Sequence, residues 1–256
     1  MEKFQEKLLI EAFKERTHFD RDELFNFFRQ FYAEMSESAL SWRIHDLLNK
    51  NIIKQVKRGV YCISNSEKYV PIVSDKLAKL SKIVAKEFDE LDYCLWTTEW
   101  LNDFTRHQIG TFFYILEVER DFVEEVFNAY SESSQFRVYL NPKEEIMERY
   151  IESGNTLIIK RLISRSPKQK VPIKEKSKDK INLPSLEKIL VDIFSDPITF
   201  YAVQGSEMKT LYENALKRYH INFSKLLNYA KRRKKENQLK VYMNEHFGDI
   251  LKDILK

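Results

Sequence analysis

The chain has 256 residues, 43% of them hydrophobic and 32% charged, a composition typical of a globular protein with one or two ordinary cores. Cys62 and Cys94 lie in apolar runs without a CxxC or Cys/His spacing, which argues against a disulfide framework or a zinc site. The N-terminal segment mixes charges into an amphipathic pattern, which excludes a signal peptide or a membrane span there. We therefore expect a cytoplasmic protein with no membrane partner.

Charge is distributed unevenly along the chain, although the net formal charge is only +4. Residues 1–70 carry 12 basic and 11 acidic side chains, residues 71–163 carry 11 and 17, and residues 164–256 carry 20 and 11. Such asymmetry indicates that different segments meet different partners, and the basic segments are available to nucleic acid or to an acidic protein.

Residues 1–70 have the pattern of three helices followed by a hairpin. Apolar residues recur at helical spacing in 3–15 and in 21–31, and Asp20 is the expected N-cap of the second helix. A third helix is expected over 35–51, with Ser36 or Ser38 as its cap and a stripe of apolar residues on one face: Leu40, Ile44, Leu47 and Leu48.

Two β-rich runs follow, "IIKQV" and "GVYCI", separated by Lys57 and Arg58. Gly59 can take the positive φ of a tight turn. The whole pattern predicts a winged helix-turn-helix, in which the second helix of the pair enters the major groove of DNA and the hairpin touches the neighbouring backbone.

The predicted DNA-binding residues follow from this geometry. If the apolar stripe of the third helix faces the core, the helical period turns the opposite side chains outward. Serines and arginines there donate to phosphates or base edges, and basic residues of the hairpin contact the backbone. The predicted residues are Ser38, Ser41, Trp42, Arg43, His45, Lys54, Lys57 and Arg58.

Other interpretations of these residues stay open. Trp42 is expected to be a partly buried aromatic rather than a base-stacking group, and His45 is also explained as a solvated helix residue. Winged helices serve as protein-docking modules too. Residues 36–61 contain only five basic and two acidic side chains, so a dimer, or the basic C-terminal third of a monomer, would have to add phosphate contacts.

Residues 71–163 alternate between helical and strand-like patterns, which predicts a central α/β domain. Only Gly110 and Gly154 interrupt it, so no glycine-rich loop is available for a nucleotide phosphate. The expected helices cover 74–91, 120–130 and 142–151, and the expected strands cover 93–98, 111–118, 136–140 and 156–163.

Residues 164–182 hold seven basic and two acidic residues and two prolines, a pattern that indicates a basic linker or loop. Residues 183–256 are expected to form a helical C-terminal part, with Pro184 in the first turn of its first helix. The expected helices there are 183–194, 207–219, 223–235 and 239–255. The predicted fold class is therefore α+β.

Two stretches resemble the AbiEi-type antitoxins of bacterial type IV toxin–antitoxin systems. "LLNKNIIKQVKRGVYCI" is similar to the family's leucine-bearing helix, strand and Arg-Gly-x-Tyr hairpin. "LPSLEKILVDIF" resembles the family's Pro-x-Glu-Lys-x-Leu-x-Asp helix, with one extra residue after the proline. The matching positions of the second stretch are Pro184, Glu187, Lys188, Leu190 and Asp192.

The resemblance implies an N-terminal domain that represses the protein's own operon by binding its operator DNA. It also implies a C-terminal domain that antagonises a nucleotidyltransferase-like toxin through a shared target rather than in a stable complex. The basic block Lys231, Arg232, Arg233, Lys234 and Lys235 is the candidate surface for this antagonism or for nucleic acid, although a solvated helix end explains it equally well.

A restriction-type nuclease is the enzymatic alternative. Glu117 and Glu119 alternate at a strand end and, with Asp92, Glu99 or Asp103, could hold Mg²⁺. The lysine expected two residues after the second carboxylate is missing, so solvated carboxylates are the favoured interpretation. We expect no enzyme, no catalytic residues, no metal and no cofactor. A transcriptional regulator with a ligand-sensing domain ranks between the antitoxin and the nuclease.

Overall fold

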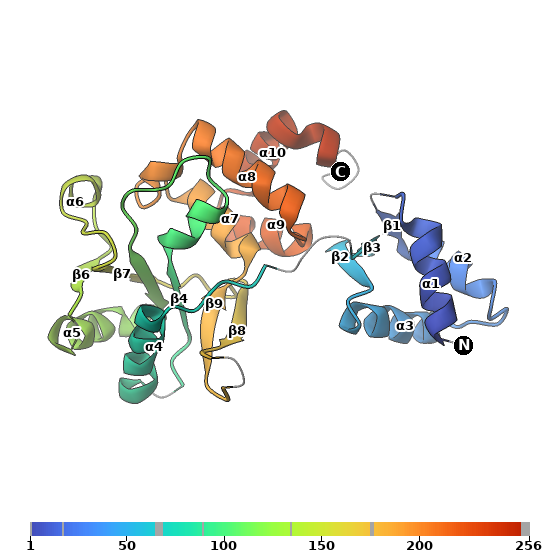
Figure 1. Ribbon diagram of the computed structural model, residues 1–256, viewed down its shortest axis with the longest axis horizontal. Coiled ribbons are helices and arrows are strands. Elements are labelled where there is room, and N and C mark those ends of the chain that lie inside the picture. Colours follow the sequence, from blue (N-terminus) through green and yellow to red (C-terminus); the bar gives the residue numbers. More distant parts are fainter. Residues whose placement is uncertain are drawn as a thin grey trace.

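The computed structural model describes residues 2–16, 18–64, 69–88, 90–133, 135–174 and 177–251 (Figure 1). Residues 2–64 form an N-terminal unit at one end of the molecule, and residues 69–251 form a larger body. The helices of the N-terminal unit are α1 (Glu2–Phe13), α2 (Arg21–Arg29) and α3 (Glu37–Asn49).

The helix caps of the N-terminal unit are those predicted. The Asp20 carboxylate accepts from the Glu23 backbone N–H at 2.8 Å, and the Glu23 carboxylate accepts from the Asp20 backbone N–H at 2.9 Å. This reciprocal pair is a capping box, which fixes the start of α2. Ser36, rather than Ser38, caps α3 by accepting from the Ala39 N–H at 3.2 Å.

A small antiparallel sheet completes the N-terminal unit, with the strand order β1-β3-β2. Its strands are β1 (Phe19–Asp20), β2 (Ile53–Lys57) and β3 (Val60–Ile63). Gly59 has φ 77° in the turn between β2 and β3, as predicted. The two-residue strand β1 was not predicted, because it is too short to show an alternating pattern. Leu24, Leu40 and Phe19 lie at the centre of the unit's own apolar core.

The body is built on a four-stranded sheet with the order β4-β5-β7-β6. Strand β4 is antiparallel to β5, whereas β5, β7 and β6 run parallel. Strands β4 and β5 are buried on both faces, which explains their nearly continuous apolar runs. The strands are β4 (Tyr93–Thr97), β5 (Tyr114–Val118), β6 (Arg137–Leu140) and β7 (Thr156–Arg161).

Helices cover both sides of this sheet (Figure 1). One side carries α4 (Asp75–Glu87) and α5 (Val123–Ser133), which are joined by a hydrogen bond of 2.6 Å from the Tyr130 hydroxyl to the Leu80 carbonyl. The short α6 (Glu144–Arg149) connects β6 to β7. Two 3₁₀ segments, η1 (Thr98–Asp103) and η2 (Arg120–Phe122), follow β4 and β5.

The segment 164–182 differs from the predicted linker or loop. It contains β8 (Lys168–Pro172) and the start of β9 (Lys180–Pro184), which pair antiparallel and pack beside β4. Ile181 and Leu183 are buried in the core with Asn182 between them, whereas Lys170 and Lys180 remain at the surface of the hairpin. The high lysine content of the segment concealed this alternation.

Four helices form the C-terminal region: α7 (Leu186–Ser195), α8 (Ser206–Arg218), α9 (Phe223–Arg232) and α10 (Glu236–Leu251), with the 3₁₀ segment η3 (Tyr201–Val203) after α7. Pro184 ends β9 instead of opening α7, and Ser185 precedes the helix. Residues 252–255 of the last predicted helix lie outside the described residues. One apolar core joins these helices to the sheet. The protein is therefore of mixed α/β class with a helical C-terminal region.

Candidate nucleic-acid interface

Helix α3 presents an exposed polar and aromatic face. Leu40, Ile44 and Leu47 are buried in the core of the N-terminal unit. The opposite side chains, Ser38, Ser41, Trp42 and His45, are exposed. Trp42 is 62% exposed, so the expectation of a partly buried aromatic is wrong. This face is free of the unit's own core and is available to a partner.

Arg21 is a residue of this face that the sequence did not reveal. Its guanidinium donates to the Ser41 hydroxyl at 2.8 Å and to the Glu37 carboxylate at 2.9 Å. Ser41 in turn donates to the Glu37 carbonyl at 2.9 Å. A cation is thereby fixed beside the N-terminal end of α3, the end that reaches base edges in helix-turn-helix proteins.

Arg43 is placed differently from the prediction. Its guanidinium lies 4.2 Å from the ring centroid of Tyr32 and 5.3 Å from that of Phe28, so it forms cation–π contacts within the N-terminal unit. The side chain is half-buried, and its planar head is held on these rings rather than at the outer face of α3.

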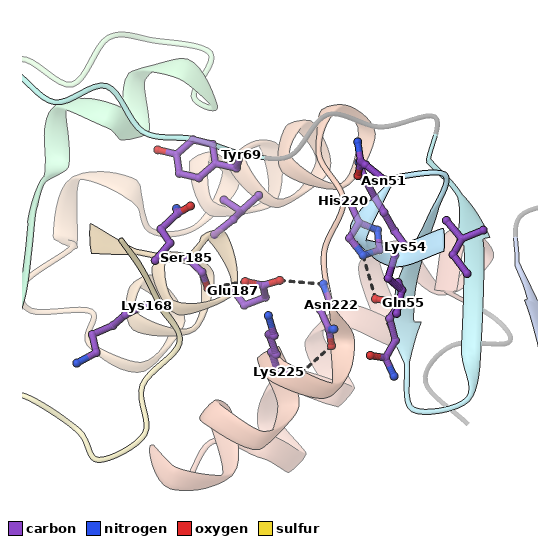
Figure 2. A pocket seen from close by; sticks show the side chains of 14 residues that line it. Asn51, Lys54, Gln55, Tyr69, Lys168, Ser185, Glu187, His220, Asn222 and Lys225 are labelled. Carbon is purple, nitrogen blue, oxygen red and sulfur yellow. Dashed lines mark hydrogen bonds between the residues drawn. The ribbon is translucent and has the colours of Figure 1, made fainter. Parts of the chain in front are cut away.

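The β2–β3 hairpin docks on the body (Figure 2). The His220 ring hydrogen-bonds the Gln55 carbonyl at 2.9 Å through Nε2, and the Arg58 backbone N–H donates to the Ser224 hydroxyl at 2.9 Å. Because a carbonyl only accepts, Nε2 carries the proton, and the Nδ1 atom lies 3.9 Å from the Cys62 sulfur as an acceptor. These contacts fix the hairpin to the turn between α8 and α9 and to the first turn of α9.

The docked hairpin changes the role of one predicted residue. Lys54 is only 6% exposed and faces the junction with the body, so its predicted place on the DNA-facing surface of the hairpin is wrong. Lys57 is half-buried, and Arg58 is exposed at the turn. Of the three predicted hairpin cations, Arg58 is therefore the one that lies fully at the surface.

The docking contact is expected to weaken in acid. Burial lowers the pKa of His220, although the Gln55 carbonyl works in the opposite direction. A depressed pKa in the folded state contributes stability above the ordinary histidine pKa of about 6.5, and this stability is lost as the pH falls below it. Amide hydrogen exchange in β2 and β3, corrected for intrinsic rates, should therefore speed up between pH 7.5 and pH 5.5.

The matched variant is His220→Gln, which keeps an N–H donor but does not titrate. Its hairpin exchange should change much less over the same pH range, and exchange in α2 should change little in both proteins. Equal pH responses of the hairpin in the wild type and the variant would contradict this role of His220.

The residues of the basic block at the end of α9 differ in their exposure. Lys231, Arg232 and Lys234 are exposed, and Lys235 is half-buried. Arg233 instead lies over the body's interior, with its Nε atom 3.6 Å from the Asp192 carboxylate. The prediction of a uniform surface patch is therefore wrong for Arg233, because a buried carboxylate draws its guanidinium inward.

Asp192 belongs to a buried ion cluster between β5, α7 and α9. The fully buried Lys188 ammonium donates to the Glu117 carboxylate and, at 2.5 Å, to Asp192. The Tyr229 hydroxyl donates to Asp192 at 2.8 Å. The two carboxylates raise the pKa of Lys188 against the effect of burial, so the lysine stays charged. Lys188 and Asp192 are matching positions of the "LPSLEKILVDIF" stretch, and both act here as internal structural groups.

A second ion pair lies nearby, between Lys160 of β7 and Asp196 after α7. Lys160 also donates to the Thr199 hydroxyl at 2.7 Å, and Thr199 donates to Asp196. Burial acts to raise the pKa of Asp196, but Lys160 and Thr199 outweigh it and lower the pKa below its ordinary value.

Lys160→Met is expected to lower the free energy of unfolding by about 2 kcal/mol at pH 7, since a charge-assisted hydrogen bond is lost. A carboxylate with a depressed pKa stabilises the fold above its unfolded pKa of about 3.9, and this contribution is lost as the pH falls through the folded value. The gap between variant and wild type should therefore shrink below about pH 4.

Urea unfolding at pH 7.0 and pH 3.5 measures this gap. Lys86→Met, which removes an exposed pair with Glu87, is the control and should change stability little at either pH. A gap for Lys160→Met that grows toward acid would contradict the assigned pair.

The carboxylates considered for Mg²⁺ are separated by the fold. Glu117 is buried and occupied by Lys188, whereas Glu119 lies beyond the end of β5 and is exposed. Asp92 pairs with Lys168. Within the described ranges, no three His, Cys, Asp or Glu side chains come together as a metal site.

These observations define a mixed α/β protein in which an N-terminal three-helix unit is docked by its hairpin on a larger body. The chain belongs to a protein family described as "Family of unknown function (DUF6577)", which it matches over residues 39–249. The match begins in α3 and includes the hairpin and the body. A comparison with curated proteins gave no match. Among the helices of the described residues, none has the length and apolar character needed to cross a bilayer.

Proposed function

We propose that the protein is a DNA-binding transcriptional repressor whose N-terminal unit is a winged helix-turn-helix. The observation that carries this proposal is the exposed face of α3, with Ser38, Trp42 and His45 outward over a closed apolar core. The element order helix, strand, two helices and hairpin, with the sheet order β1-β3-β2, supports it. A 13-residue helix is long enough to lie in a major groove.

The small number of cations in the N-terminal unit suits DNA binding through a few sequence-specific contacts. Arg21 stands beside the N-terminal end of α3, and Lys57 and Arg58 stand at the hairpin turn. Arg21 is paired with Glu37, so these residues neutralise few phosphates. Binding as a dimer, or with help from the exposed Lys231, Arg232 and Lys234, would supply the remaining affinity.

A reporter gene placed behind the DNA upstream of this protein's own gene tests the repressor proposal in cells. Wild-type protein should reduce expression of the reporter, and a Trp42→Ala, His45→Ala variant should restore it at equal protein level. Equal expression with the wild type and the variant would contradict the proposal.

We further propose that the protein is the antitoxin of a type IV pair and opposes a nucleotidyltransferase-like toxin without a stable complex. The support is the AbiEi-type resemblance, whose second stretch coincides with β9 and α7 and whose Lys188 and Asp192 join α7 to β5 and α9. The exposed lysines and arginine at the end of α9 are the surface we assign to the antagonism.

Co-expression with a toxin gene encoded beside this chain tests the antitoxin proposal. Growth should be rescued by the full chain and lost with Lys231→Ala, Arg232→Ala, Lys234→Ala at equal protein level. Toxicity that persists in the presence of the full wild-type chain would contradict the proposal.

A ligand-responsive regulator is the second candidate function. It is favoured by a cavity of about 370 Å³ between the hairpin and the body, which is within the size range of small-molecule sites. The cavity lies where a ligand would contact both parts of the protein.

A further inference from the structure

The carboxyl ends of the parallel strands in the body meet at a cleft of about 650 Å³, called the strand-end cleft below. Strand β6 ends at Leu140 and β7 ends at Arg161, and both residues line the cleft. Arg120 lines it from the segment that follows β5. Ligands of open α/β sheets bind outside the carboxyl ends of the strands, and this volume is within the range of small-molecule sites.

Three guanidinium groups converge on the strand-end cleft. Arg120 and Arg161 are exposed there, and within the part of the chain that the structure describes neither guanidinium forms an ion pair or a hydrogen bond. Arg233 lines the cleft from the end of α9, and its Nε atom lies 3.6 Å from the Asp192 carboxylate, beyond ordinary hydrogen-bond distance. These groups come from three separate segments, so they form one donor set only in the folded protein.

Two carboxylates line the same cleft beside the arginines. Asp121 lies in η2 and Glu124 in the first turn of α5, and both are exposed. An ionised carboxylate only accepts hydrogen bonds, and an acidic residue accepts from the ribose hydroxyl in dinucleotide-binding sheets. A ligand that carries both a phosphate and hydroxyl groups therefore matches this lining better than a simple anion does.

The other charged residues of the lining compensate each other. Lys160 and Asp196 form an ion pair, so they add no net charge to the cleft. A cavity of about 20 Å³ shares these two residues with the cleft and is also lined by Trp96. The Trp96 indole is buried, and its Nε1–H has no acceptor among the described residues. A buried donor without an acceptor is costly, so a ligand oxygen that reaches this region is favoured.

We propose that the strand-end cleft binds a phosphorylated sugar, either free or as part of a nucleotide. Arg120 and Arg161 hold the phosphate, because the planar guanidinium pairs with phosphate oxygens through two parallel hydrogen bonds. Asp121 and Glu124 accept from the hydroxyl groups of the sugar. The described residues that line the cleft all belong to the body, so the site does not depend on the proposed DNA binding by the N-terminal unit.

Isothermal titration of the full-length protein tests the site. The probes are ribose 5-phosphate and adenosine 5′-monophosphate, compared with ribose and with inorganic phosphate. At least one of the two sugar phosphates should bind about tenfold more tightly than ribose and than inorganic phosphate, because only a sugar phosphate engages both kinds of side chain. Tighter binding of adenosine 5′-monophosphate than of ribose 5-phosphate would identify a nucleotide as the ligand, and the reverse order would identify a free sugar phosphate.

The Arg120→Ala, Arg161→Ala variant tests the phosphate contacts. It should weaken binding of the sugar phosphate by about tenfold or more, since charge-assisted hydrogen bonds are lost. Both arginines are exposed, so the fold should be kept, as measured by circular dichroism. Arg106→Ala, which removes an exposed arginine outside the cleft, is the matched control and should leave binding unchanged.

The Asp121→Ala, Glu124→Ala variant separates specific contacts from general attraction. Removal of two negative charges strengthens the general attraction of every anion. Loss of the hydroxyl contacts instead weakens the sugar phosphate while inorganic phosphate binds at least as tightly as before. We expect this second pattern.

Four results would overturn the site. They are no binding of either sugar phosphate, binding that Arg120→Ala, Arg161→Ala leaves unchanged, an equal loss with Arg106→Ala, and a sugar phosphate that binds more tightly to Asp121→Ala, Glu124→Ala. The DNA-binding proposal fails separately, since a protein that binds a sugar phosphate through its arginines but binds no DNA would retain this site and lose the repressor function.

Discussion

Lys188→Met is expected to lower the free energy of unfolding by about 3–5 kcal/mol, the cost of leaving buried charges without their partner. Lys188 is fully buried and donates to both Glu117 and Asp192. Methionine fills a similar volume but cannot compensate either carboxylate. Urea unfolding followed by circular dichroism at pH 7 measures the loss. Lys217→Met, which removes an exposed pair with Glu213, should cost less than about 1 kcal/mol.

A combined variant separates charge from packing. Adding Glu117→Gln and Asp192→Asn to Lys188→Met removes both buried carboxylates but leaves Arg233 without Asp192, so it should recover only part of the lost stability. If the triple variant is as unstable as the sum of its single changes, packing rather than charge explains the loss. A stability change below about 1 kcal/mol for Lys188→Met would contradict the buried cluster altogether.

Trp42→Ala combined with His45→Ala is expected to weaken binding to the operator by about 100-fold, because each good base contact contributes about 1–3 kcal/mol. Both side chains are exposed, so the free energy of unfolding should hardly change. Binding is measured by fluorescence anisotropy on DNA from upstream of the protein's own gene. Tyr150→Ala, which removes an exposed aromatic residue directly after α6, is the control and should bind as the wild type does.

Binding of the Trp42→Ala, His45→Ala variant is also measured on scrambled DNA. Nonspecific binding depends on phosphate contacts, which the two alanines leave in place, so the affinity for scrambled DNA should fall much less. A variant that binds the operator as tightly as the wild type would remove the exposed face of α3 from DNA recognition.

Local signals in the sequence were enough to predict most elements of the fold. Asp20 and Ser36 are short polar residues directly before apolar periodic segments, and both cap helices as expected. Gly59 takes the positive φ that the hairpin turn requires. Strands β4 and β5 of the body appear as apolar runs because they are buried on both faces.

The sequence could not reveal features that depend on long-range contacts. Lys54 is buried because the body docks over β2, and Arg43 turns away from the α3 face because Tyr32 offers a ring. Neither partner is adjacent to these residues in the sequence. The β8–β9 hairpin was concealed because its apolar residues alternate with lysines whose number suggested a linker.

The residues of the candidate site also fall into those that the sequence predicts and those that only the tertiary structure reveals. The exposed residues of α3 could be predicted because a helical period fixes which side chains point outward. The addition of Arg21, the approach of Arg233 to Asp192 and the cavity between the hairpin and the body required the tertiary structure. Side chains that come from separate segments share no local sequence pattern. The sequence alone therefore does not predict that they lie close together.

The central claim is that the N-terminal unit recognises a DNA sequence through α3, and fluorescence anisotropy of the full-length protein tests it most directly. The protein is titrated onto its own upstream DNA and onto scrambled DNA at low and moderate salt, beside a Lys57→Ala, Arg58→Ala variant. We expect a preference for the upstream DNA that survives moderate salt, and a salt slope that falls by up to about 2 in the variant. Equal, salt-sensitive binding to both DNAs, or no binding to either, would contradict it.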